Sequence, residues 1–85
     1  MSFFVYIIGS FKEKKLTTYV GWTNNIDERL KKHNSNKGAR STKGRAWELL
    51  YFEEMKSKSD ALKREYGLKK DRKFRNYIKS QFFKN

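Results

Sequence analysis

The stretch FFVYII, residues 3–8, decides how the rest of the chain is interpreted. It is a short run of aromatic and β-branched residues that ends at Gly9-Ser10, a pattern typical of a strand buried on both faces. Since a strand in the middle of a small sheet is covered on both sides, this composition favours the central position. Connection lengths alone leave the order of the first two strands open.

A second strand is predicted in LTTYVGW, residues 16–22, with Tyr19 and Gly21 on the same face because side chains alternate. The polar segment 9–15 between the two strands is long for a tight turn, and we expect it to form an ordinary hairpin loop. Symmetric closure of this loop places Tyr6 opposite Thr18 or Tyr19. That register brings the two tyrosines within direct contact distance.

A helix is expected directly after the second strand. Asn24 or Asn25 can cap it, and it runs to about Asn34. The following segment, residues 34–45, is rich in Asn, Ser, Gly and cations, so we expect a mobile basic loop without periodic structure. The helix presents one face at the spacing i, i+3, i+4 and i+7, made of Ile26, Arg29, Leu30 and His33.

The C-terminal part of the chain predicts a third strand at 47–55 and two further helices. Ser57 and Asp60 form a capping-box pattern that opens a helix through about Lys70, and Asp71 can cap the last helix. The inner faces are predicted to be Ala61, Leu62, Glu65 and Leu68 on the first helix and Phe74, Tyr77, Ile78, Gln81 and Phe82 on the second. The order β-β-α-β-α-α predicts an α+β fold, a small three-stranded antiparallel sheet flanked by helices.

Length and charge limit the possible functions. A chain of 85 residues has room for one domain, residues 1–85. Lys and Arg number 21 against 9 Asp and Glu, which gives a formal net charge of +12. Such a surplus indicates a polyanionic partner, most often nucleic acid and less often an anionic membrane surface, while a merely basic solvated surface is the remaining alternative. The aromatic content of 16% is too high for a disordered basic tail.

The chain contains neither cysteine nor proline, which excludes a disulfide framework and a thiolate metal site. A reducing cytoplasm is therefore the expected compartment. The longest strongly apolar run is too short to span a bilayer and lacks the pattern of a signal peptide. We expect a soluble cytoplasmic protein that does not enter the membrane.

Arg29, His33 and Glu65 stand where the helical period expects apolar residues. A buried carboxylate without a partner is costly, so Glu65 needs a cation partner, a metal or an opening to solvent. One interpretation is a buried ion pair between Glu65 and Arg29. The other is that Glu65 holds a divalent cation while Arg29 faces a phosphate. For His33, the structural alternative is a place beside the carbonyl groups of the helix end, where positive charge is favourable.

Taken in order, five segments resemble the GIY-YIG nuclease superfamily, in particular its small single-domain members. The segments are FVYII, TYVGWTNNIDERLKKH, KGARSTKGR, LLYFEEM and SDALKREYGLK. The resemblance covers nearly the whole chain, from Phe3 to Arg72. Two departures stand out: the first motif reads FVY where the family name has GIY, so that Phe4 replaces the glycine, and Trp22 follows the glycine of the second motif.

The resemblance implies hydrolysis of phosphodiester bonds with one divalent ion, Mg²⁺ or Mn²⁺. A single glutamate suffices for Mg²⁺, which keeps several waters and takes other ligands from the substrate. By resemblance, Tyr19 activates water and Tyr6 orients it, roles that are open to exchange, and His33 is a second proton acceptor or relay. Arg29 supplies a charged fork for phosphoryl oxygens. The catalytic residues implied are Tyr6, Tyr19, Arg29, His33 and Glu65, with Glu65 as the metal ligand.

Contacts to nucleic acid are expected from a glycine and from the basic loop. Gly21 lets the backbone approach the substrate because it has no Cβ. The loop cations contact the phosphate backbone and carry little base information. These cations are Lys37, Arg40, Lys43 and Arg45.

Three functions remain open from the sequence. The first is a metal-dependent endonuclease acting on DNA as a monomer or weak homodimer, with branched or damaged DNA, and thus DNA repair, as a candidate role. The second is a non-catalytic basic module that binds nucleic acid on the same fold. The third is a basic structural protein of a ribonucleoprotein. The choice between DNA and RNA stays open at this point.

Overall fold

The fold was obtained as a computed structural model, which describes residues 2–84. The elements follow the predicted order β-β-α-β-α-α, so the α+β fold class is confirmed. A short 3₁₀ helix, η1, is added between the first helix and the third strand. The bounds are β1 Phe3–Lys12, β2 Lys15–Thr23, α1 Ile26–Asn34, η1 Arg40–Thr42, β3 Glu48–Met55, α2 Lys58–Lys70 and α3 Arg72–Lys84.

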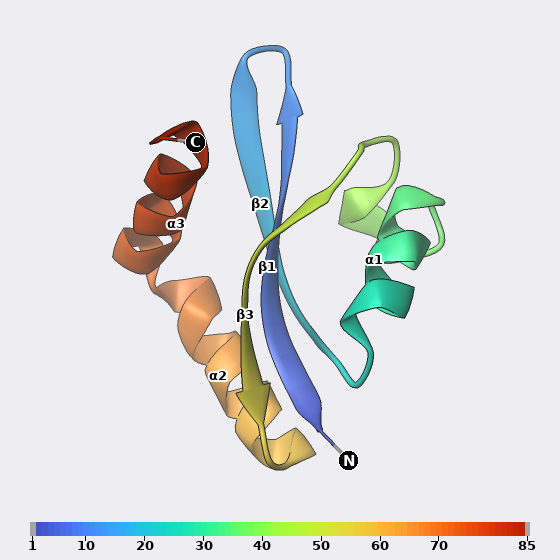
Figure 1. The fold of residues 1–85 in the computed structure, drawn as a ribbon, viewed down its shortest axis with the longest axis vertical. Helices are drawn as coiled ribbons and strands as arrows, with labels where there is room; N and C mark the ends of the chain where they lie inside the picture. The colour runs from blue at the N-terminus through green and yellow to red at the C-terminus, as the bar shows by residue number, and fades with distance from the viewer. Residues whose placement is uncertain (1, 85) are drawn as a thin grey trace.

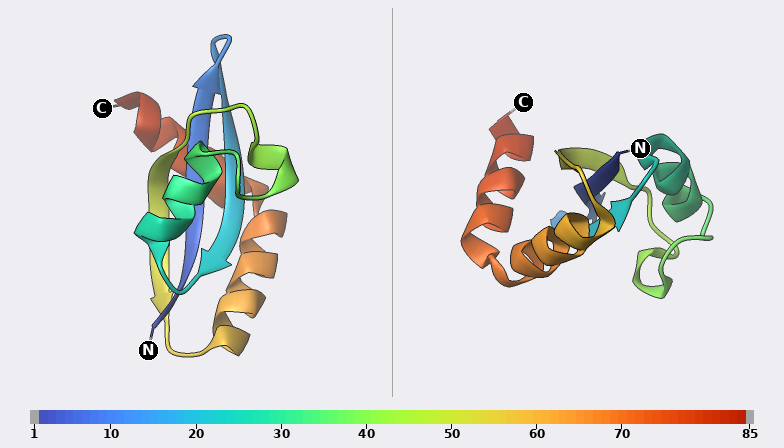
Figure 2. Two further views of the ribbon diagram at one scale, coloured as in Figure 1. Left: turned by 90° about the vertical axis from the view of Figure 1, so that its right-hand side faces the viewer. Right: turned by 90° about the horizontal axis from the view of Figure 1, so that it is seen from below.

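The three strands form one antiparallel sheet in the order β2-β1-β3, which confirms the central position of β1 (Figure 1). The physical reason is the one expected: residues Val5 to Ile8 are buried on both sides of the sheet. Helices α2 and α3 cover one face of the sheet, and α1 with η1 covers the other (Figure 2). β1 therefore contributes alternate side chains to two different layers.

The predicted hairpin loop and its register are wrong. The strands continue to Lys12 and Lys15, and the turn consists of Glu13 and Lys14, whose φ angles are 55° and 65°. This pairing places Tyr6 opposite Gly21 and Ile8 opposite Tyr19. Two successive positive φ values are typical of the tight turns that match strand twist, but Asn-Gly is their usual sequence signal. The turn carries no such signal here, so the loop was expected to be longer.

The helix starts agree with the predicted caps. The side chain of Asn25 accepts a hydrogen bond from the backbone N–H of Glu28, at 3.1 Å. Ser57 accepts from the N–H of Asp60 at 3.1 Å and thus begins α2. The same contact begins α3, where the Asp71 carboxylate accepts from the N–H of Phe74 at 3.0 Å. Such caps satisfy N–H groups that have no partner within the helix.

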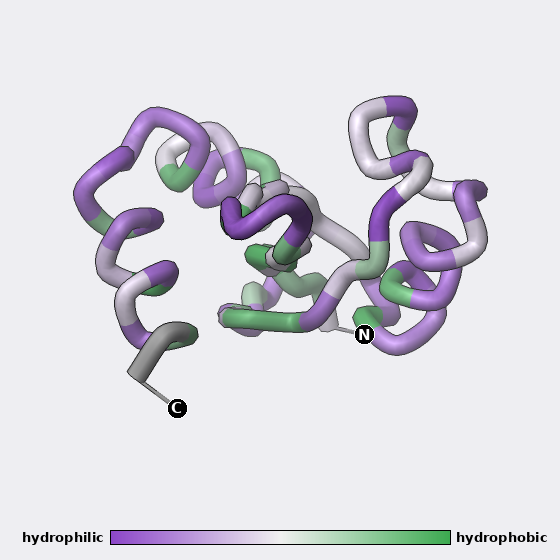
Figure 3. Tube along the Cα trace, turned by 90° about the horizontal axis from the view of Figure 1, so that it is seen from above, coloured by the Kyte–Doolittle hydropathy of each residue, from purple (hydrophilic) through white to green (hydrophobic). Residues whose placement is uncertain are grey.

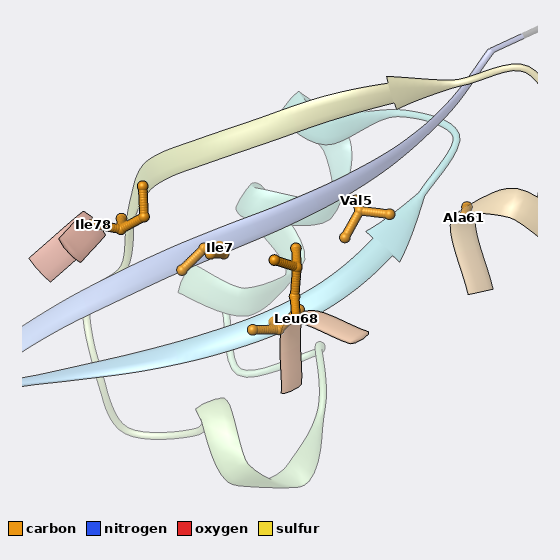
Figure 4. Close-up of a cluster of buried hydrophobic side chains, with 6 residues drawn as sticks. Val5, Ile7, Ala61, Leu68 and Ile78 are labelled. Carbon is orange, nitrogen blue, oxygen red and sulfur yellow. The ribbon is translucent and has the colours of Figure 1, made fainter. Parts of the chain in front are cut away.

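The main core lies between the sheet and α2–α3 (Figure 4). Its buried members are Val5, Ile7, Val20, Ala61, Leu68 and Ile78. Two predictions for the inner helix faces are wrong, because Leu62 is 42% exposed and Tyr77 is 57% exposed. Among the described residues of these helices the buried ones are few, Ala61 and Leu68 on α2 and Ile78 on α3, so apolar neighbours such as Leu62 and Tyr77 turn towards solvent.

The basic segment between α1 and β3 contains periodic structure, contrary to the prediction. Residues Arg40–Thr42 form η1, and several hydrogen bonds tie the segment to its surroundings. The side-chain amide of Asn34 donates to the carbonyl oxygen of Trp47 at 3.1 Å and accepts from the N–H of Trp47 at 2.6 Å. The side chain of Asn36 accepts from the N–H of Gly44 at 2.8 Å. In Figure 3, hydrophilic colouring predominates on the helices and connecting segments, whereas hydrophobic colouring gathers in the strands. The segment is polar yet locally ordered by its own asparagines.

Candidate active site

The two tyrosines lie on the α1 side of the sheet, next to Gly21. A Cβ added at Gly21 would lie 2.5 Å from the hydroxyl oxygen of Tyr6 and 3.1 Å from Cε2 of Tyr19. Both rings therefore border one small space above the glycine. They are diagonal neighbours across the β1–β2 pair, not directly opposite each other. In this structure Gly21 makes room for the phenols.

His33 joins this pair from the last turn of α1. Its Nε2 atom lies 2.8 Å from the hydroxyl oxygen of Tyr6, and its ring centroid lies 5.2 Å from that of Tyr19. The side chain is only 1% exposed. Burial, together with the positive charge of Arg29, holds the pKa of His33 below its usual range. The imidazole is thus neutral at neutral pH.

Thr42, which the sequence did not single out, completes the surroundings of His33. Its Oγ1 atom lies 2.9 Å from Nδ1 of His33, and its side chain is fully buried. A Cβ added at Gly38 would overlap the same imidazole, so the backbone passes directly against the ring. In the sequence, Gly38 and Thr42 are two small residues in a segment with several cations, and nothing there signals their burial.

Arg29 and Glu65 lie near enough to Tyr6 to change its ionisation. Burial raises the pKa of Tyr6 far above its usual value, and the neighbouring hydroxyl of Tyr19 adds to this. The guanidinium of Arg29 acts in the opposite direction, and the carboxylate of Glu65 raises the pKa further. The structure thus brings Tyr6, Tyr19 and His33 close together, while Arg29 on α1 and Glu65 on α2 act on the pKa of Tyr6 through their charges.

The ion pair considered for Glu65 and Arg29 is not formed within the described residues. Glu65 instead lies 3.7 Å from Lys69 on its own helix, and its side chain is 18% exposed. Arg29 is half-buried and lines a small hollow of about 70 Å³ together with Thr23 and Lys32. The carboxylate is therefore reachable, and the guanidinium keeps its donors for another group.

The four loop cations differ in their exposure to solvent. Lys37, Arg40 and Lys43 are exposed, whereas Arg45 is half-buried. Charged groups that are free in solvent can bind phosphate oxygens without breaking internal pairs. The loop thus offers a mostly accessible set of positive charges beside η1.

Two features are absent from residues 2–84. No group of three or more His, Asp or Glu side chains comes together there as a metal cage. No helix in this range has the length and apolar character needed to cross a membrane.

Comparison with known proteins gives concordant results. Residues 2–78 match the family described as the GIY-YIG catalytic domain. A UPF0213 protein of Clostridium perfringens is 46% identical over 68 residues, which are 79% of this chain and 70% of that protein. A UPF0213 protein of Staphylococcus haemolyticus is 43% identical over 67 residues, 78% of each chain. The solution NMR structure of a UPF0213 protein from Bacillus halodurans superimposes with a TM-score of 0.51 at 35% identity, covering 95% of this chain and 85% of that one.

Proposed function

The chain belongs to the GIY-YIG catalytic domain family, a family of nuclease type, and from this premise we propose that it is an endonuclease that hydrolyses phosphodiester bonds in DNA with one divalent cation. One observation carries the proposal. The side chains of Tyr6, Tyr19 and His33 meet above Gly21, and the charges of Arg29 and Glu65 act on Tyr6. This combination matches what phosphodiester hydrolysis needs: a water-activating group, a positive charge for phosphoryl oxygens and a cation ligand.

The residues present fit a divalent cation at Glu65. The carboxylate is partly exposed, and its ion pair with Lys69 is long at 3.7 Å and easily replaced. A single carboxylate suits Mg²⁺ or Mn²⁺, because these ions keep several waters and take phosphate oxygens of the substrate as ligands. When bound, such an ion supplies charge neutralisation on the phosphate and assistance to the leaving oxygen.

The two tyrosines receive different roles. Tyr6 is 3% exposed and its pKa is raised, so it stays protonated at neutral pH and is suited to orienting water through its hydroxyl. Tyr19 is half-buried, and we assign it to accepting a proton from the attacking water. A phenol needs cationic help to act as a base, and Arg29 is the positive group of this site. His33 serves as the relay behind Tyr6.

DNA binding is assigned to the exposed positive charges. The net charge of +12 and the free cations of the segment 37–45 favour a phosphate backbone as partner. Contacts of this kind position the backbone and carry little sequence information. We therefore expect affinity that falls steeply with salt and depends weakly on base sequence.

The proposal is tested by cleavage of plasmid, flap and branched DNA with Mg²⁺ or Mn²⁺, comparing Glu65→Gln with Glu48→Gln. Glu48 is exposed on β3 and serves as the matched control. We expect Glu65→Gln to lower the cleavage rate about 10²-fold or more with unchanged DNA affinity, since a charge-stabilising group is lost. Equal cleavage by both variants removes the metal role of Glu65.

One observation favours a second candidate, a non-catalytic module that binds nucleic acid. Tyr6 and His33 are 3% and 1% exposed, so the innermost part of the site is nearly closed to a substrate. Tight, salt-sensitive binding of DNA or RNA without turnover under any divalent ion would favour this function. Cleavage abolished by Glu65→Gln decides against it.

A further inference from the structure

Thr42 is the most buried polar side chain among the described residues, although cations flank it in the sequence. Its hydroxyl has two partners, Nδ1 of His33 at 2.9 Å and the carbonyl oxygen of Ala39 at 2.7 Å. Its backbone carbonyl accepts a hydrogen bond from Nε1 of Trp47 at 2.8 Å. The residue is therefore held from both its side chain and its backbone.

These contacts determine where the hydrogens lie. The carbonyl of Ala39 can only accept, so the single hydroxyl hydrogen of Thr42 is donated to it. The Thr42 oxygen then faces Nδ1 of His33 as an acceptor, and Nδ1 must carry the ring hydrogen. In a neutral imidazole the other nitrogen, Nε2, is bare, so it accepts the hydroxyl hydrogen of Tyr6 across 2.8 Å.

The ring has little freedom to adopt another arrangement. The backbone at Gly38 passes so closely that a Cβ there would overlap the imidazole. On the far side of Thr42, Trp47 is 4% exposed and holds the η1 turn through its indole N–H. Rotation of the His33 ring would break two buried hydrogen bonds, which is costly in a site that excludes water.

We propose that Thr42 is a positioning residue, which fixes His33 in its Nδ1–H form and so keeps the hydroxyl hydrogen of Tyr6 on the His33 side. The lone pairs of the Tyr6 oxygen are then left to accept a hydrogen bond from the attacking water. With the opposite tautomer, Nε2–H would donate to the Tyr6 oxygen and turn its hydroxyl hydrogen towards the site. The hydroxyl hydrogen of Tyr6 would then bind the lone pair of the water oxygen, which the water needs for its attack on phosphorus. This inference rests on the proposed function and deepens it.

The first test is a measurement of the tautomer that does not depend on activity. The chain has a single histidine, so the ¹⁵N NMR signals of its ring nitrogens belong to His33 without further assignment. We expect a protonated Nδ1 and a bare Nε2 in the wild type at neutral pH. Thr42→Ser keeps a hydroxyl and should keep this pattern, whereas Thr42→Val should shift it towards Nε2–H. Ser41→Ala, at an exposed position of the same turn, is the matched control.

The second test is the rate of DNA cleavage by the same variants. We expect Thr42→Val to lower kcat about 10- to 100-fold with unchanged KM, the size typical of a misplaced reacting group, and Thr42→Ser to restore the rate. A wild type in the Nε2–H form overturns the inference, and so does a Thr42→Val protein that retains Nδ1–H or the full rate. If no variant cleaves DNA, the proposed function fails, while the NMR result still decides the role of Thr42. If Thr42→Val does not fold, the wild-type and Thr42→Ser spectra decide it.

Discussion

The two faces of β1 are held by different forces. Towards α2–α3, Val5 and Ile7 pack in an apolar cluster of aliphatic and aromatic side chains. Towards α1, Tyr6 packs against His33 and Trp47, and its buried groups are joined by hydrogen bonds. The same strand thus supplies an apolar core and a polar layer that contains the candidate site, through alternate residues.

Because different interactions hold the two faces of β1, mutations on each face should have different effects. In the apolar layer, stability follows the buried area and the quality of packing, at about 25 cal/mol per Å². In the polar layer, each lost partner leaves a buried group unsatisfied, at about 1–3 kcal/mol. A change on the first face should therefore reduce stability above all, and a change on the second should also alter the chemistry.

The largest expected effect is on the apolar face, with Leu68→Ala. Leu68 is fully buried, so we expect a loss of about 2–5 kcal/mol in the free energy of unfolding. The control is Leu62→Ala on the same helix, where the side chain is 42% exposed and the loss should stay within about 1 kcal/mol. Denaturant unfolding followed by circular dichroism measures both. Similar losses would contradict the assignment of the inner face of α2.

An intermediate effect is expected on the polar face, with Gly21→Ala. The added methyl group meets the Tyr6 hydroxyl and the Tyr19 ring, so we expect a loss of about 1–3 kcal/mol together with a fall in DNA cleavage. The tyrosines must move, and the Tyr6–His33 hydrogen bond with them.

Gly67→Ala is the matched control for this change. Apart from its chain neighbours and the backbone of its own helix, no atom of the described residues lies within 4 Å of the added Cβ, and the position is exposed within α2. Alanine should stabilise the helix there by about 0.5–1 kcal/mol without changing cleavage. Unfolding curves and cleavage rates of the two variants are compared side by side. A neutral Gly21→Ala would show that the phenols are free to shift.

The smallest expected effect is the pH dependence of an ion pair between Glu53 and Arg64 on the α2–α3 side of the sheet. Arg64 binds the Glu53 carboxylate through Nε at 3.0 Å and Nη2 at 2.8 Å, and the Tyr51 hydroxyl donates to the same carboxylate at 2.5 Å. The hydrogen bonds from Arg64 are the largest cause that lowers the pKa of Glu53 below its usual value. The ion pair therefore stabilises the fold at pH values above the usual glutamate pKa. This stabilisation is lost as the pH falls through the lowered pKa of Glu53.

We expect the contribution to be about 1 kcal/mol or less, because the side chain of Arg64 is 38% exposed and solvent screens the pair. Unfolding free energies measured between neutral pH and about pH 3 should fall less steeply in Glu53→Gln than in the wild type. Glu48→Gln, at an exposed position of β3, should keep the wild-type slope. An unchanged slope in Glu53→Gln would assign the acid sensitivity to other carboxylates.

Local patterns predicted much of the fold. The doubly apolar run at 3–8 indicated the central strand, and Asn25, Ser57 and Asp71 cap the helices as expected. These features succeed because each depends on a few neighbouring residues. The register of β1 and β2 failed because Glu13 and Lys14 adopt positive φ without the usual glycine signal.

Some residues of the candidate site could be predicted from the sequence, and others could not. Arg29, His33 and Glu65 could be identified because they interrupt an apolar helical period. Thr42 could not be identified, because a threonine among exposed cations gives no sign of burial until the η1 turn packs against His33. The Glu53–Arg64 ion pair could not be predicted either, because it joins residues on two different elements, β3 and α2.

By itself, the sequence determined the elements, their order, the central strand and the polar residues that interrupt the apolar faces, because these follow from short-range periodicity and capping. Only the tertiary structure decided which side chains face each other above Gly21 and which partner each buried polar group takes. The physical reason is that such contacts join residues far apart in the chain and depend on a strand register that a single turn of two residues sets.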